Sequence, residues 1–168
     1  MAIEIDDNVY LRSARSTANQ LDIWFIHGFG ESGLSFQEAF ASRLTRQYNL
    51  FAPDFPGFGA SPPGRAGKGL NGSFRVLRSL IDTLSKNRKI AIVAHSMGGI
   101  LGTWLSRDLG PRVITYINVE GNLTNSDTSF SARVDREASA EAAHRKLLSL
   151  LWQRGRTSTA YQRYSLSL

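Results

Sequence analysis

The segment 90–99 limits the possible folds of this chain more than any other feature. It contains an apolar run, a serine and two glycines. The five residues from Ile90 to Ala94 predict a buried strand, and residues 100–105 predict the start of a helix. Ser96 lies between the two, where a sharp turn exposes the hydroxyl group. Such a turn needs small residues two positions before and two after the serine, and an alanine and a glycine stand there. The segment is therefore a variant of the pattern Gly-x-Ser-x-Gly.

Two further apolar runs, each followed by a glycine-rich turn, precede the serine. Residues 22–30 combine a strand pattern with the tetrapeptide His-Gly-Phe-Gly, and residues 49–61 combine a second strand with a turn rich in proline and glycine. Helical patterns follow at 73–85 and 97–108. This alternation predicts an α/β fold, with a mostly parallel sheet covered by helices on both faces.

The rest of the chain is expected to add a β-hairpin at the N-terminal end and a helix near the C-terminal end. The other expected elements are a hairpin of Ala2 to Ile5 and Val9 to Ala14, a helix over Leu34 to Tyr48, a strand over Val113 to Val119 and a helix over Ala138 to Trp152. No further strand is expected after Asn122. The sequence thus divides into a core, 1–122, and a helical segment, 123–168.

In this order and at these separations, the three glycine-containing segments resemble the α/β-hydrolase superfamily. The resemblance covers roughly Ile23 to Asn122. Full members of that family carry a lid insertion, two more strands and the catalytic histidine after the strand expected at Val113 to Val119. The resemblance therefore implies a hydrolase fold whose C-terminal strands are missing, with 123–168 similar to a lid or cap.

The resemblance also implies roles for individual residues. Ser96 would be the nucleophile, and the backbone N–H groups of Phe29 and Met97 would form the oxyanion hole. Asp54 would be structural and hold its glycine-rich turn. Residues expected beside the substrate are His27, Gly28, Gly30 and His95, with Phe55 and Phe58 as apolar walls.

A catalytic triad also needs an acid and a base. Most family members place the acid after a strand that this chain lacks. Some place it after the strand that follows the serine helix, where Glu120 stands; otherwise Glu120 is a glutamate that caps the turn before Gly121. As for the base, His27 would hold its own loop, and His95 would point away from the partner of Ser96. His144, on the last expected helix, is more typical of a solvated histidine. The sequence therefore predicts no effective general base and a truncated or degenerate hydrolase.

Composition and the absence of certain motifs limit which partners, cofactors and cellular location we expect. The 168 residues carry a net charge of +6, but the basic residues are scattered, so we expect no nucleic acid. No run suits a bilayer span and no secretory signal is expected, so the predicted location is cytoplasmic. The chain has no cysteine, and neither metal-ligand spacing nor a dinucleotide fingerprint, so no metal and no cofactor are expected.

The predicted function is that of a serine hydrolase acting on a small, ester-like molecule. The alternative is a non-catalytic binding module or pseudo-enzyme on the same scaffold. Dehalogenase and epoxide hydrolase chemistry is disfavoured, since both use an aspartate nucleophile where this chain has Ser96. The edge of the strand at Val113 to Val119 would be exposed and predicts self-association.

Overall fold

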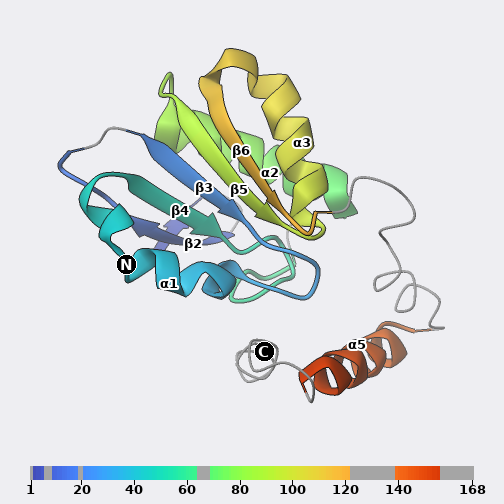
Figure 1. Ribbon diagram of the computed structural model, residues 1–168. Coiled ribbons are helices and arrows are strands. Elements are labelled where there is room, and N and C mark those ends of the chain that lie inside the picture. The colour runs from blue at the N-terminus through green and yellow to red at the C-terminus, as the bar shows by residue number, and fades with distance from the viewer. Residues whose placement is uncertain (1, 6–8, 19–20, 64–68, 122–138, 156–168) are drawn as a thin grey trace. The chain divides into compact units, whose positions relative to one another are not determined.

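The computed structural model describes residues 2–5, 9–18, 21–63, 69–121 and 139–155. The chain forms two compact units, Met1–Gly121 and Asn122–Leu168. The first unit holds a six-stranded sheet with its helices (Figure 1). Of the second unit, the structure describes one helix, α5 (Ala140–Gly155).

The sheet is mixed, and its strand order is β1-β2-β4-β3-β5-β6. The strands are β1 (Ala2–Ile5), β2 (Val9–Ala14), β3 (Asp22–Ile26), β4 (Asn49–Pro53), β5 (Ile90–His95) and β6 (Val113–Val119). β2 pairs antiparallel with both β1 and β4, whereas β4, β3, β5 and β6 run parallel. The predicted hairpin and α/β sheet are therefore confirmed.

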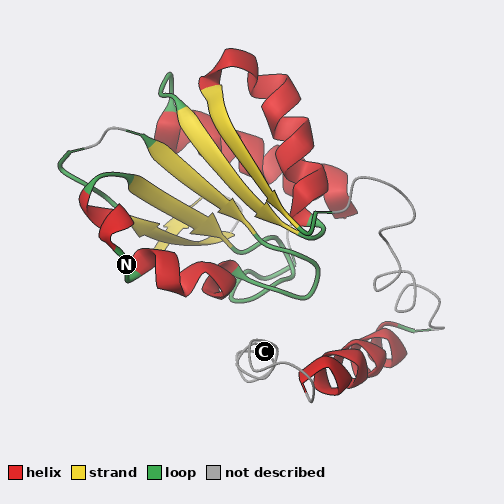
Figure 2. Ribbon diagram, viewed as in Figure 1, coloured by secondary structure: helices red, strands yellow, loops and turns green. Residues whose placement is uncertain are grey.

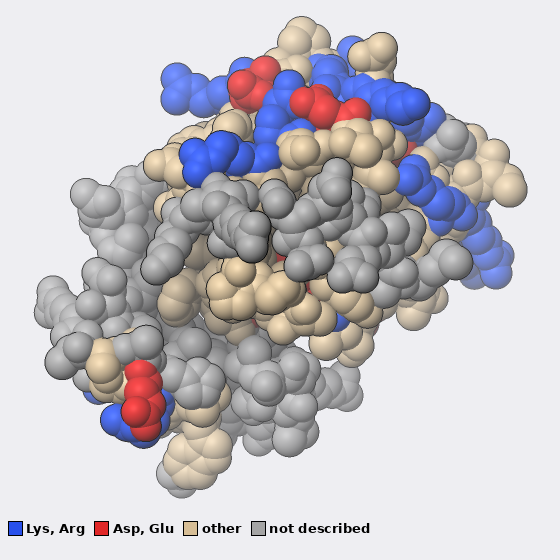
Figure 3. Space-filling view, turned by 180° about the vertical axis from the view of Figure 1, so that it is seen from behind, with Lys and Arg blue, Asp and Glu red and all other residues tan. Residues whose placement is uncertain are grey.

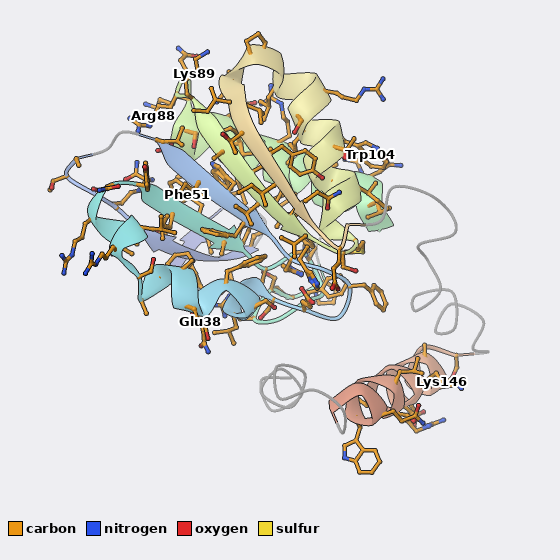
Figure 4. All side chains as sticks on the ribbon, in the orientation of Figure 1. Glu38, Phe51, Arg88, Lys89, Trp104 and Lys146 are labelled. Atoms are coloured by element: carbon orange, nitrogen blue, oxygen red, sulfur yellow. The ribbon has the colours of Figure 1, made fainter. Side chains whose placement is uncertain are left out.

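Helices cover the sheet on both faces (Figure 2). The larger core lies against α2 (Gly69–Ser85) and α3 (Gly98–Leu109). In it the rings of Trp24 and Phe51 stack with centroids 4.6 Å apart, and the Trp24 indole N–H donates a hydrogen bond to the Ser85 hydroxyl at 3.0 Å. Figure 4 labels Phe51 within the sheet. These contacts fix α2 to β3 and so set the frame in which β5 and α3 meet.

The prediction of one helix over Leu34 to Tyr48 is wrong. The segment consists of a 3-10 turn at Gly33–Phe36, α1 at Gln37–Phe40 and a second 3-10 turn at Arg43–Arg46. Ser42 interrupts it, because its hydroxyl accepts a hydrogen bond from the Leu44 amide and starts a new turn. A similar 3-10 turn, Gly110–Arg112, joins α3 to β6.

β6 forms one edge of the sheet formed by the described residues. It carries three large apolar side chains that are exposed: Ile114 at 56%, Ile117 at 50% and Val119 at 43%. By its register, Ile117 lies beside Val93 and Val119 beside His95 on β5. The edge is thus apolar as well as unpaired among the described strands.

Lys and Arg side chains gather along the upper part of the face shown in Figure 3, with acidic side chains among them. Ion pairs join α2, α3 and the turn before β6, since Arg78 contacts both Asp82 and Asp108, and Arg112 contacts Asp82. Part of the basic charge is therefore neutralised locally. Among the described helices, none has the length and apolarity that crossing a membrane requires.

Candidate active site

Ser96 stands at the turn between β5 and α3, at the end of the sheet where the parallel strands finish. Its φ angle is +50°, a left-handed conformation that residues other than glycine rarely adopt. The Ser96 amide donates a hydrogen bond to the Val119 carbonyl at 3.0 Å, and the Ser96 carbonyl accepts one from the Gly99 amide at 2.8 Å. The backbone is thus held on both sides in a conformation that costs free energy, as is typical of functional sites.

Two glycines allow the backbone to pack closely around this serine. A Cβ atom on Gly98 would lie 2.5 Å from the Ile26 carbonyl oxygen, so α3 begins directly against the end of β3. A Cβ atom on Gly28 would lie 3.0 Å from the Ser96 Cβ atom. The loop after β3 therefore lies against the serine. A larger residue at Gly28 would push this loop away from Ser96, and a larger residue at Gly98 would push α3 away from the end of β3.

The amides expected to form an oxyanion hole flank Ser96. Phe29 belongs to the loop after β3, and Met97 precedes the first turn of α3. Within 21–63 and 69–121, neither backbone N–H donates a hydrogen bond to the protein. The Phe29 ring lies edge-on to Phe58, with centroids 5.8 Å apart, so the loop also carries an apolar wall.

His27 is fully buried and both of its ring nitrogens are engaged. Its Nδ1 lies 2.8 Å from the Gly28 carbonyl, and its Nε2 accepts a hydrogen bond from the Phe55 amide at 3.0 Å. That pattern assigns the proton to Nδ1. Burial lowers the pKa of His27 from 6.5 to about 4, so the ring is neutral at pH 7. His27 ties the loop after β3 to the loop after β4 and is not placed to take a proton from Ser96.

Glu31, which the sequence reasoning did not single out, joins the loop after β3 to the end of β5. Its buried carboxylate accepts the Gly28 amide at 2.7 Å and the Nδ1–H of His95 at 2.9 Å. The hydrogen bond to Glu31 raises the pKa of His95; burial opposes the rise, and the charges of Glu31 and Glu120 add to it. A carboxylate three residues after Gly28, within reach of a turn amide, was the signal available in the sequence.

Asp54 holds the second glycine-rich loop. Its buried carboxylate pairs with Arg12 and accepts the amides of Gly33 at 2.7 Å and Ala60 at 2.8 Å. A Cβ atom on Gly59 would lie 2.2 Å from this carboxylate, so that position also requires a glycine. The contacts are those of a residue that shapes the loop rather than one that faces a substrate.

Glu120 follows β6 directly and lies at the same end of the sheet as Ser96. Its φ angle is +49°, so Ser96 and Glu120 adopt the same rare conformation after neighbouring strands. The Glu120 side chain is exposed, and its charge acts on His95. His144 lies on α5, and its side chain falls outside the described part of the chain.

No cluster of three or more His, Cys, Asp or Glu side chains suited to a metal ion occurs among the described residues. The described site combines three features: a strained serine, two backbone amides without an acceptor among the described residues, and a carboxylate directly after the next strand.

Comparison with known proteins identifies the family to which the fold belongs. A family model for the alpha/beta hydrolase fold matches residues 23–145. An uncharacterized protein of Mycobacterium bovis is 31% identical over 90 residues, which are 54% of this chain and 26% of that protein. The match thus spans about a quarter of the length of the curated relatives.

Solved structures show the same fold. A hydrolase from Pseudomonas aeruginosa superposes with a TM-score of 0.70 at 18% identity, over 100% of this chain and 66% of that one. A carboxylesterase of Nitrososphaera gargenis superposes with a TM-score of 0.65 at 18% identity, over 80% of this chain and 51% of that one.

Proposed function

The chain belongs to the alpha/beta hydrolase fold family, and we propose that it provides the nucleophile and oxyanion hole of a serine hydrolase acting on a small ester-like substrate. The observation that carries the proposal is the left-handed backbone of Ser96 at the β5–α3 turn, with the free amides of Phe29 and Met97 beside it. The likeness to a carboxylesterase supports the ester as substrate class.

In the proposed reaction the Ser96 hydroxyl attacks the carbonyl carbon of the ester. Negative charge then develops on the carbonyl oxygen, which accepts hydrogen bonds from the Phe29 and Met97 amides. Met97 stands at the N-terminus of α3, where the helix dipole favours negative charge. Collapse of the tetrahedral species expels the alcohol and leaves an acyl group on Ser96, which water removes.

The proton of Ser96 needs an acceptor that a carboxylate orients. We propose Glu120 as that carboxylate, because it follows the strand next to Ser96 and carries an exposed side chain at the same end of the sheet. His27 does not serve as the base, since both its nitrogens are engaged. His144 belongs to α5 in the second unit, and a solvated histidine is the commoner role on such a helix.

The second candidate is a binding module that uses the same site without turnover. It is favoured by one observation: both ring nitrogens of His27 and the Nδ1 atom of His95 are already in hydrogen-bond contact with the Gly28 carbonyl, the Phe55 amide and the Glu31 carboxylate. On this view the oxyanion hole binds a carbonyl or carboxylate oxygen and no acyl group is transferred.

A fluorophosphonate probe distinguishes the two. We expect slow formation of an adduct, mapped to Ser96 by mass spectrometry of peptides, and only feeble hydrolysis of p-nitrophenyl acetate, because the activating base is weak or absent. Ser96→Ala should remove the adduct, while Ser79→Ala, at an exposed serine of α2, should leave it unchanged. A chain on which Ser96 never reacts would be a binding module. Rapid labelling would show that a base is present, and His144→Ala is then the variant to make.

A further inference from the structure

Glu31 lies between the two backbone segments that meet at Ser96. One of its carboxylate oxygens accepts the Gly28 amide at 2.7 Å and lies 2.9 Å from the Nδ1 atom of His95, the last residue of β5. The Glu31 amide in turn donates to the Gly28 carbonyl at 3.3 Å and closes a tight turn. A single buried side chain therefore connects the loop after β3 to the end of β5, directly before Ser96.

We infer that Glu31 is a positioning residue: it fixes the loop after β3 against β5, so that the Phe29 amide and not the Gly28 amide faces the reacting carbonyl. The inference rests on the proposed function and deepens it, since it names the residue that sets the oxyanion hole. It extends to His95, which contacts the same carboxylate oxygen of Glu31 as the Gly28 amide does.

The geometry leaves the Gly28 amide no other role. A Cβ atom added to Gly28 would lie 3.0 Å from the Ser96 Cβ atom and 3.1 Å from the Glu31 carboxylate, so Gly28 is enclosed between the two. Its N–H is already donated to Glu31. The next amide along the loop is that of Phe29, which has no acceptor among the described residues. Glu31 thus separates a structural amide from a free one at adjacent positions.

The buried carboxylate needs both of its partners. Removing a carboxylate from water is costly unless hydrogen bonds and an opposite charge replace the solvent. The Gly28 amide and the His95 ring supply these, and charge-assisted hydrogen bonds of this kind are short and strong. Loss of either partner would leave Glu31 incompletely satisfied and would free the loop to move relative to Ser96.

The charge of this pair changes when His95 titrates. Glu31, from the loop after β3, and Glu120, at the end of β6, are the charged groups that act on His95. With His95 protonated, the pair of Glu31 and His95 is neutral. When His95 loses its proton, one negative charge remains beside the position where the oxyanion develops, and it disfavours that charge.

The first test compares Glu31→Gln with Glu38→Gln, at an exposed glutamate of α1 (Figure 4). The rate constant for phosphonylation of Ser96 should fall at least about tenfold in Glu31→Gln, because loss of one oxyanion donor costs roughly 10²–10³ in rate. With p-nitrophenyl acetate the loss should fall on kcat and not on KM. Glu38→Gln should match the wild type. Equal rates in the two variants, with Ser96 labelled in both, would overturn the inference.

The second test does not depend on activity. In the full 168-residue chain, the amide proton resonance of Gly28 should shift with pH in step with the His95 ring, and both shifts should change in Glu31→Gln. A Gly28 resonance that ignores the His95 titration overturns the inference even where Ser96 does react. If Ser96 never reacts but the two titrations remain coupled, the proposed hydrolase function fails while the positioning by Glu31 stands.

Discussion

At the scale of single residues, the backbone of Ser96 opposes stability. A left-handed φ of +50° costs an L-residue with a Cβ atom roughly 1–2 kcal/mol, and glycine avoids this cost. We therefore expect Ser96→Gly to be more stable than Ser96→Ala, by about 1 kcal/mol in urea unfolding.

Ser79, in the middle of α2, provides the control for that comparison. At this exposed helical site glycine should be less stable than alanine, by about 1 kcal/mol. The two sites should thus respond with opposite sign. If glycine destabilised both to the same extent, the turn at Ser96 would carry no strain.

His27 makes stability depend on pH in a stated direction. Its pKa is 6.5 in the unfolded chain and about 4 in the folded one, because it is buried. Between these values the unfolded state binds a proton that the folded state does not, so the free energy of unfolding falls as the pH is lowered from 6.5 to 4. The full effect is roughly 3 kcal/mol.

Comparison with His27→Asn isolates this contribution, because the other titrating groups are common to both proteins. The stability advantage of the wild type over the variant should shrink by roughly 3 kcal/mol between pH 7 and pH 4 in urea unfolding. An advantage that stays constant over this range would mean that His27 binds its proton equally well in the folded and unfolded chains.

At the scale of elements, a helix or strand was predicted correctly where its own residues carried a clear pattern. The strand at Val113 to Val119 agrees with β6 in both bounds, because apolar β-branched residues and a Gly-Pro stop before it are unambiguous. The prediction of one helix over Leu34 to Tyr48 was wrong, because its regularly spaced apolar residues do not pack as one face of a single helix. Phe36 and Phe40 both pack on Phe25, at 5.1 and 6.0 Å between ring centroids, while Ser42 ends the helix between them and Leu44.

Among the residues of the site, too, those with a strong local signal were predicted and those without one were not. Sequence reasoning placed Ser96 at a strand–helix turn, because that turn depends on local residues, and the structure has this turn. It did not find Glu31, because the partner that makes Glu31 informative is His95, 64 residues later in the chain. Pairings across the sheet cannot be deduced from the residues next to one of the partners. The role of Glu120 in the triad stays a prediction.

At the scale of the whole molecule, the edge strand β6 predicts association. Among the described residues, the outer backbone groups of β6 have no neighbouring strand, and with the exposed side chains of Ile117 and Val119 they form a surface on which a second chain can pair. We expect sedimentation velocity to show dimers or larger species as the concentration rises. Ile117→Lys should shift the chain to a monomer, since charges on an edge strand discourage pairing.

Thr83→Lys, at an exposed position of α2, adds the same charge away from the edge and should not alter the association. A wild-type chain that sediments as a monomer at every concentration would contradict the prediction. Association that Ile117→Lys and Thr83→Lys weaken equally would point to net charge and not to β6.

The packing of Trp24 has an optical consequence. The chain has three tryptophans: Trp24 is buried against Phe51, Trp104 is partly buried on α3, and Trp152 on α5 is 63% exposed. Acrylamide should therefore quench the emission of Trp152 readily and that of Trp24 hardly at all. In Trp152→Phe the remaining fluorescence arises from the sheet-containing unit alone. Its red shift in urea then follows the exposure of Trp24 and of the partly buried Trp104 to water, and so records the unfolding of the scaffold that holds Ser96.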